Sequence, residues 1–277
     1  MFFKNFKVWE TELAGRKLTL ETGKMAGLAN ASIMARYGET EVLCTVTASA
    51  KPREGVDFFP LSVDYEEKMY AVGKIPGSFL RREGRAGEKA ILTSRCIDRP
   101  IRPLFPKDLR NDCSVVATVM SVDPDCSPEI TAAIGVSAAI AISDIPWAGP
   151  ISSVNVGIVD GEIVINPTLE QRAKTDLTLT VASTADLVAM IEAGGNEIDD
   201  ETMFNAIMAG HEENKKIVKF IQGIVDEVGK PKFEYESSDP DPEIMKEIED
   251  FCIEDVKKAL DTVSYTHLRA HETPEHL

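Results

Sequence analysis

Positive charge is concentrated in one short stretch of an otherwise acidic chain. Between Gly73 and Lys107 there are nine lysines and arginines and three acidic residues, so the stretch carries +6 within 277 residues whose net charge is −16. A local reversal of this kind favours an anionic ligand bound at one place, while the acidic remainder repels polyanions elsewhere. The alternative is an arginine-rich surface that the acidic remainder neutralises.

The spacing of the charges favours a nucleic-acid ligand. Arg81, Arg82 and Arg85 lie between two glycines, so we expect them on an exposed loop. Phe79 and Leu80 precede them directly. An aromatic or apolar pair joined to guanidinium groups can contact a base and its phosphate together, which is how single strands are commonly held.

The run EKAILTSRCID, which follows the loop, predicts a helix that ends near Asp98, because Pro100 disfavours helical geometry at the residue before it. Arg95 and Asp98 are three positions apart, so they could form an ion pair. Arg99 and Arg102 are expected to flank prolines on a stiff, non-helical segment. We interpret the loop and the helix end together as an anion-facing surface.

The elements around this stretch are mostly strands before residue 199 and helices after it. A helix of small residues from Ile130 to Ser143 suits close packing on a sheet, and the β-rich block with its two helices suits an α+β two-layer domain. Helical spacing predicts one long amphipathic helix or two up to Val228, and another after Pro242. We predict strands near Phe6–Glu10, Lys17–Thr22, Ala31–Tyr37, Glu41–Ser49, Ser114–Val122, Ile151–Val159, Glu162–Ile165 and Leu177–Ala182, an extended segment over Phe58–Tyr70, and a last strand with a Gly-Gly turn within Asp186–Ile198.

The block from Asp57 to Pro106 closely resembles the first ribonuclease-PH-like domain of the bacterial polynucleotide phosphorylases, and its flanks are similar from near Trp9 to about Leu260. The resemblance implies an α+β, ribonuclease-PH-like (ribosomal protein S5 domain 2-like) two-layer domain followed by a small all-helical domain. It places the first domain at residues 1–198 and a partial helical linker domain at 199–263. The run SYTHLRAHETPEHL, residues 264–277, does not resemble the family and is interpreted as a non-native tail.

The resemblance also implies a function. The family members are phosphorolytic 3′-to-5′ exoribonucleases that form a ring-shaped homotrimer, thread single-stranded RNA through a central pore, and use Mg²⁺ and inorganic phosphate; further proteins of RNA degradation are expected partners. An aromatic pair followed by two arginines lines the pore constriction, and the matching residues here are Phe79, Leu80, Arg81 and Arg82, with Leu80 in place of the usual second aromatic.

The family's phosphate-binding and catalytic residues lie in a second ribonuclease-PH-like domain, so the resemblance assigns no catalytic residue to this chain. We therefore expect the chain to contribute RNA-binding residues and to be inactive alone. The alternative is a non-catalytic RNA-binding and ring-forming module, and the coding sequence after Val263 would distinguish the two.

Other motifs indicate structure rather than chemistry. Asp123, Asp125 and Glu129 could be read as metal ligands, but an Asp-Pro turn, a capping Ser127 and Pro128 at a first helical position explain the run better, so no metal site is predicted. There is no Walker A or dinucleotide fingerprint, and the one histidine before residue 264 has no catalytic partners. Five scattered cysteines and no apolar run long enough to span a bilayer favour a cytoplasmic protein without membrane contact.

Overall fold

The computed structural model describes residues 5–77, 79–235, 237 and 241–261. The chain divides into two units, residues 1–236 and 237–277, and each is described by itself. The predicted non-native tail, residues 264–277, lies outside the described residues.

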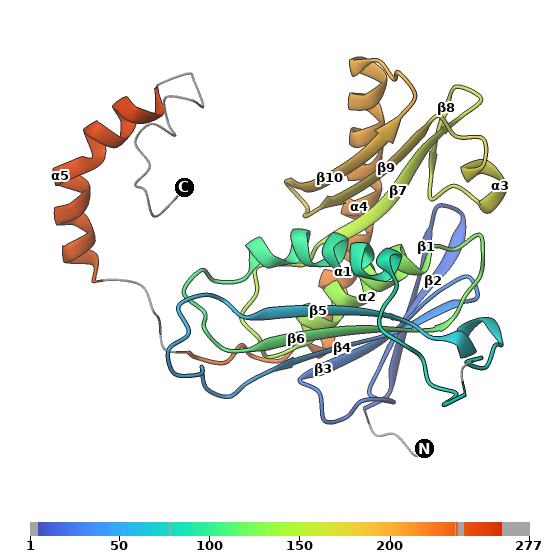
Figure 1. Cartoon of the computed structure of the whole chain (residues 1–277), viewed down its shortest axis with the longest axis horizontal. Helices are drawn as coiled ribbons and strands as arrows, with labels where there is room; N and C mark the ends of the chain where they lie inside the picture. Colours follow the sequence, from blue (N-terminus) through green and yellow to red (C-terminus); the bar gives the residue numbers. More distant parts are fainter. Residues whose placement is uncertain (1–4, 78, 236, 238–240, 262–277) are drawn as a thin grey trace. The chain divides into compact units, whose positions relative to one another are not determined.

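A six-stranded sheet with the order β1-β2-β3-β4-β6-β5 forms the base of the first unit (Figure 1). All neighbours are antiparallel except β5 and β6, which run parallel. In β4 and β6 buried and half-buried positions alternate along most of the strand, as expected when one face of a sheet packs on a core. The strands are β1 Lys7–Leu13, β2 Arg16–Thr22, β3 Ala31–Tyr37, β4 Thr40–Ala48, β5 Leu61–Glu67 and β6 Cys113–Ser121.

Two helices, α1 (Glu88–Ile101) and α2 (Pro128–Ile142), lie side by side on this sheet, α1 against β5 and α2 across β3 and β4. α2 approaches the sheet closely because its residues are small. A Cβ on Gly135 would lie only 2.7 Å from the Cys44 Sγ and 2.9 Å from the Ala35 Cβ. The predicted small-residue helix is therefore confirmed.

The start of α2 is also confirmed. Ser127 is the N-cap, and its Oγ accepts the Ile130 N–H at 3.4 Å. Pro128 takes the first helical position, where its missing N–H costs nothing.

A second, four-stranded antiparallel sheet has the order β10-β9-β7-β8. Its strands are β7 Ser152–Val159, β8 Glu162–Ile165, β9 Leu177–Ser183 and β10 Val188–Gly195, with the short helix α3 at Leu169–Arg172. One long helix, α4 (Asp200–Val228), packs on β7 and β9 and contacts α2, and its Gly210 allows close approach to Val181. α4 belongs to the same compact unit as the sheets. The start of a linker domain at residue 199 stays a prediction.

The helix after the basic loop is longer than predicted. α1 continues through Pro100 to Ile101, and the Arg102 N–H donates to the Asp98 carbonyl. Pro100 costs the helix one hydrogen bond. However, Ile97, Pro100 and Ile101 are all buried, and burial of one aliphatic side chain contributes about 1.5–3 kcal/mol. Core packing therefore outweighs the local preference to stop at Asp98.

Two further boundaries differ from the sequence prediction. The extended segment over 58–70 contains only the strand β5, and a 3₁₀ helix η1 follows at Met69–Val72. The Gly-Gly pair after β10 does not form a turn, because Gly194 and Gly195 pair with Thr178 and Leu177 as the last residues of the strand.

The segment after α4 returns to the end of α2 and holds it. The Lys232 ammonium donates to the carbonyl oxygens of Ala141 at 3.0 Å and Ser143 at 2.7 Å, where a helix end leaves acceptors without partners. The Phe233 N–H donates to the Asp144 carbonyl at 2.7 Å. Residues 230–235 therefore belong to the first unit and close one end of its core.

In the second unit the structure describes one helix, α5 (Pro242–Leu260). Asp241 is its N-cap and accepts the Glu243 N–H at 2.9 Å, and Pro242 takes the first position. The prediction of a helix that begins at Pro242 is confirmed.

Candidate nucleic-acid interface

The basic stretch forms an exposed loop between η1 and α1. Gly73 ends η1 in the left-handed conformation at φ 68°, and Gly87 is the N-cap of α1. Phe79 is fully exposed and Leu80 is 70% exposed. The apolar pair is therefore available to a ligand. Burial of each of the two side chains on a partner would contribute about 1.5–3 kcal/mol.

Arg81 bends the loop directly after this pair. Its φ is 50°, in the left-handed region that a residue with a side chain enters at a cost of about 1–2 kcal/mol. Arg81, Arg82 and Arg85 are all exposed. The predicted exposed loop, with an apolar pair followed by guanidinium groups, is therefore present.

Two further arginines of the predicted surface lie on the solvent side of α1. Arg95 and Arg99 are four positions apart and exposed, whereas Ala90, Thr93 and Ile97 face the core. Arg99 is therefore helical rather than on a non-helical segment. This face of α1 extends the exposed basic surface away from the loop.

The structure separates the arginines by their partners. Among the described residues no carboxylate pairs with Arg81, Arg85 or Arg95, so their charges are available to a ligand. The Arg99 Nη1 lies 4.0 Å from the Glu192 Oε2, at the limit of an ion pair.

Arg102 is already bonded within the fold. It lies in a 3₁₀ helix, η2 (Arg102–Leu104), and makes hydrogen bonds of 2.9 and 2.7 Å to both carboxylate oxygens of Asp98 and one of 3.1 Å to the Leu61 carbonyl. Asp98 thus pairs with Arg102, and not with Arg95 as the sequence also allowed, because the chain stays helical beyond Asp98 and places Arg102 on the same face, four residues on.

A carboxylate inside the loop ties it to the sheet. One oxygen of Glu83 accepts the Met69 N–H at 2.5 Å, and the other lies 3.7 Å from the Lys68 ammonium. Lys68 also pairs with Glu66 on β5 at 2.9 Å, and the hydrogen bond with Glu66 is the main cause that raises the pKa of Lys68. The sequence did not predict this contact, which joins Glu83 to residues fourteen and fifteen positions earlier in the chain.

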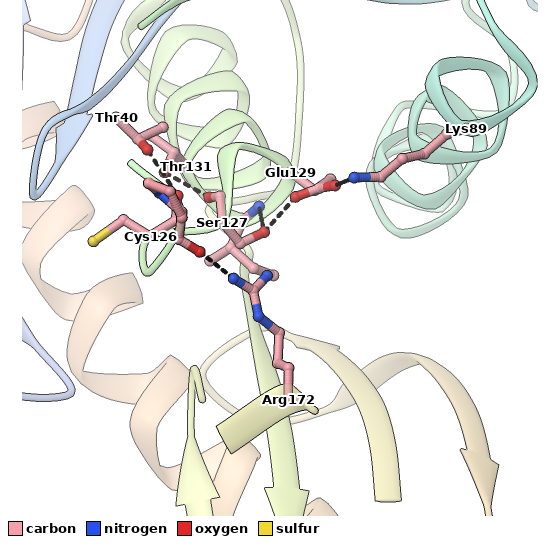
Figure 2. A network of polar contacts seen from close by, with 9 residues as sticks. Thr40, Lys89, Cys126, Ser127, Glu129, Thr131 and Arg172 are labelled. Atoms are coloured by element: carbon pink, nitrogen blue, oxygen red, sulfur yellow. Dashed lines mark hydrogen bonds and ion pairs between the residues drawn. The ribbon is translucent and has the colours of Figure 1, made fainter. Parts of the chain in front are cut away.

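Beside Lys68 and Met69, the partners of Glu83, a pocket of about 510 Å³ opens between the first turns of α1 and α2. Figure 2 shows the polar contacts at its edge: the Lys89 ammonium lies 2.7 Å from Glu129, which also accepts the Ser127 hydroxyl at 2.5 Å. Arg172 reaches the same edge from α3 and donates to the Pro124 carbonyl. Three basic and three acidic side chains line this pocket: Lys68, Lys89 and Arg172, and Glu67, Asp123 and Glu129. Because these charges balance, the pocket lacks the excess positive charge of the loop.

The carboxylates weighed as metal ligands are used inside the fold. Asp123 accepts the Asp125 N–H at 3.0 Å, which is the main cause that lowers the pKa of Asp123. Burial alone would raise the pKa of Glu129, but the hydrogen bonds from Lys89 and Ser127 outweigh it and lower that pKa. Across the described part of the chain no group of three His, Cys, Asp or Glu side chains could hold a metal ion.

Comparison with known proteins assigns most of the first unit to one family. Residues 14–146 match domain 1 of the 3′ exoribonuclease family, and residues 149–213 match its domain 2. Together the two matches cover more than half of the chain. The chain belongs to the 3′ exoribonuclease family. The second match extends into α4, in agreement with the packing of that helix on the second sheet.

Similar curated proteins carry one name. Polyribonucleotide nucleotidyltransferase of Ruminiclostridium cellulolyticum is 60% identical over 255 residues, which are 92% of this chain and 36% of that protein. The protein of the same name from Caldicellulosiruptor saccharolyticus is 58% identical over 248 residues, 90% of this chain and 35% of that protein. The chain thus spans about a third of the length of these relatives and matches the ribonuclease-PH-like portion.

Among solved structures, rice (Oryza sativa) Rrp46 superposes with a TM-score of 0.60 at 16% identity, over 80% of this chain and 95% of that one. This likeness confirms the α+β ribonuclease-PH-like fold that the sequence predicted. Within the described ranges, no helix combines the length and the apolar character needed to cross a membrane.

Proposed function

We propose that this chain is the N-terminal, RNA-channel portion of a phosphate-dependent 3′-to-5′ exoribonuclease, a polyribonucleotide nucleotidyltransferase that acts in RNA degradation and processing in the cytoplasm. The names of its relatives support this reaction class. In this proposal the parent protein is a homotrimer that uses Mg²⁺ and inorganic phosphate and works with further RNA-degradation proteins. We assign no catalytic residue to this chain, and its described residues include no group of three His, Cys, Asp or Glu side chains that could hold a metal ion.

The role of this chain is to hold the strand. Arg81, Arg82 and Arg85 contact RNA phosphates, while Phe79 and Leu80 contact bases. Arg95 and Arg99 on α1 continue the phosphate contacts beyond the loop. We keep Arg102 as a support of this surface, since its guanidinium is already bonded to Asp98.

One observation carries the proposal. The exposed pair Phe79 and Leu80 stands directly before arginines in a chain with a net charge of −16, and at least Arg81 and Arg85 have no carboxylate partner in the described part of the chain. Unpaired cations clustered at one place on an acidic protein attract anionic ligands to that place.

A salt titration of single-stranded RNA binding tests the proposal. Replacement of Arg81, Arg82 and Arg85 by Ala should change the slope of log affinity against log salt by about 2, at about 0.7 per phosphate contact, with a similar loss for different homopolymers. The matched control replaces Lys51, Lys174 and Lys219, three exposed lysines elsewhere, by Ala. Equal slopes in the arginine variant and the wild-type chain would rule out the loop as the RNA contact.

A further inference from the structure

Glu83 is out of place in an RNA-binding loop. It lies between Arg82 and Arg85, and a carboxylate there repels the phosphates that the arginines attract. On charge alone, removal of Glu83 should tighten RNA binding.

The contacts of Glu83 point to another role. Glu83 is an exposed residue like its neighbours 79–82 and 84–89, but its side chain is only 29% exposed, and both carboxylate oxygens face the body of the protein. One accepts the Met69 N–H at 2.5 Å and the other faces the Lys68 ammonium at 3.7 Å. The charge of Glu83 is therefore directed to a partner and away from a bound strand.

These contacts connect the loop to the sheet. Lys68 follows β5 directly and pairs with Glu66, whose carboxylate also accepts the Thr118 hydroxyl of β6 at 3.4 Å. Met69 begins η1, and its carbonyl accepts the Lys74 N–H at 2.9 Å where the loop leaves the helix. The middle of the loop is thus held to the same few residues as its beginning.

We propose that Glu83 is a positioning residue for RNA binding: it fastens the loop to β5 and η1, so that Arg81 and Arg85 are presented to the strand in one fixed arrangement. Such preorganisation means that the loop is ordered on folding and not on binding, which strengthens binding without any contact from Glu83 itself. The inference rests on the proposed function, because it supposes that the loop meets RNA.

The test compares carboxylate variants of the whole chain in RNA binding. Glu83→Ala should weaken binding of a single-stranded homopolymer about five- to tenfold, although it removes a negative charge from a basic loop. Glu83→Gln keeps an oxygen that can accept the Met69 N–H and should recover part of the loss. Glu88→Ala is the matched control, since it removes the same charge in the same stretch, at the first turn of α1. It should leave the affinity unchanged or raise it slightly.

A second measurement reports on the loop itself. Trypsin cleaves after arginine, so cleavage after Arg81, Arg82 and Arg85 should be faster in Glu83→Ala than in the wild-type chain or in Glu88→Ala. An affinity for Glu83→Ala that equals or exceeds the wild-type value would overturn the inference, as would unchanged cleavage.

The two proposals fail differently. If the triple arginine variant binds RNA with the wild-type salt slope, or if the wild-type chain does not bind RNA, the proposed function fails and takes the inference with it. If the arginines prove necessary while Glu83→Ala behaves like Glu88→Ala, only the positioning role is wrong.

Discussion

The Lys89 ammonium lies 2.7 Å from the Glu129 carboxylate, so one ion pair joins the first turn of α1 to the first turn of α2. α2 is fixed on the sheet by its small residues, and α1 begins where the basic loop ends. The pair therefore sets the position of the end of the loop relative to the core. The Glu129 side chain is 25% exposed, which protects the contact from solvent more than an open surface pair.

Glu129→Gln should lower the free energy of unfolding by about 1 kcal/mol at neutral pH, because it removes a charge-assisted hydrogen bond that is partly screened on the lysine side. The pKa of Glu129 in the folded chain lies below its ordinary value of 4.5. Its ionised form therefore stabilises the fold fully above that value, and the contribution is lost as the pH falls through the lower, folded-state pKa. Urea unfolding of both proteins across pH 3–7 measures this, and a gap that does not narrow below about pH 4 would contradict it.

Arg95→Ala and Arg102→Ala should separate binding from stability. Arg95 has no carboxylate partner within the described ranges, so its loss should weaken RNA binding and reduce the salt slope by about 0.7 while the melting temperature stays unchanged. Arg102 is bonded to Asp98 and Leu61, so its loss should cost about 1 kcal/mol of stability and leave the slope unchanged. The two variants serve as each other's control in one thermal and one salt series. A lower melting temperature for Arg95→Ala together with a smaller salt slope for Arg102→Ala would contradict both expectations.

Leu80→Phe should tighten binding of single-stranded RNA with little change in salt slope, because base stacking contributes about 1–3 kcal/mol and carries no charge. Leu80 is 70% exposed, so the ring fits without displacing the core. Leu169→Phe is the control, since it adds a ring at a leucine of α3 that is 56% exposed. Equal affinities for the two variants would show that position 80 does not meet a base.

The purified chain should release no nucleoside diphosphate from poly(A) in the presence of phosphate and Mg²⁺. The expectation follows from the assignment of the reacting groups to a part of the parent outside this chain. A polyribonucleotide nucleotidyltransferase of full length is the positive control. Robust phosphate-dependent release by this chain alone would place an active site within it.

Local signals predicted much of the fold, and tertiary packing decided what they missed. The signals for the Ser127-Pro128 cap and for the strands β3 and β4 are local, so the sequence predicted the bounds of these elements within a residue. Pro100 also acts locally, but the burial of Ile97 and Ile101 overrides it, and burial depends on a sheet that sequence spacing does not place. The partners of Arg102 depended on this one extra turn of helix.

The same distinction holds for the candidate site. The exposed pair at 79–80 and the arginines of the loop were predicted from the residue types, their spacing between glycines and the family resemblance, and their RNA contacts stay a prediction. The tie from Glu83 to Met69 was not predicted, because it joins a side chain to a backbone N–H fourteen residues earlier. No pattern of residue types records a contact of that kind.

The three residues Lys232, Phe233 and Tyr235 limit how far the polypeptide can be shortened. Lys232 supplies donors to carbonyl oxygens of Ala141 and Ser143, and the Tyr235 hydroxyl donates to Asp108 at 2.8 Å. A protein truncated at Val228, where α4 ends, would keep all the described strands and the helices α1, α2 and α4 that pack on them, yet it would uncover the end of α2. The smallest piece that retains this core therefore extends to Tyr235, seven residues beyond the last helix of the unit.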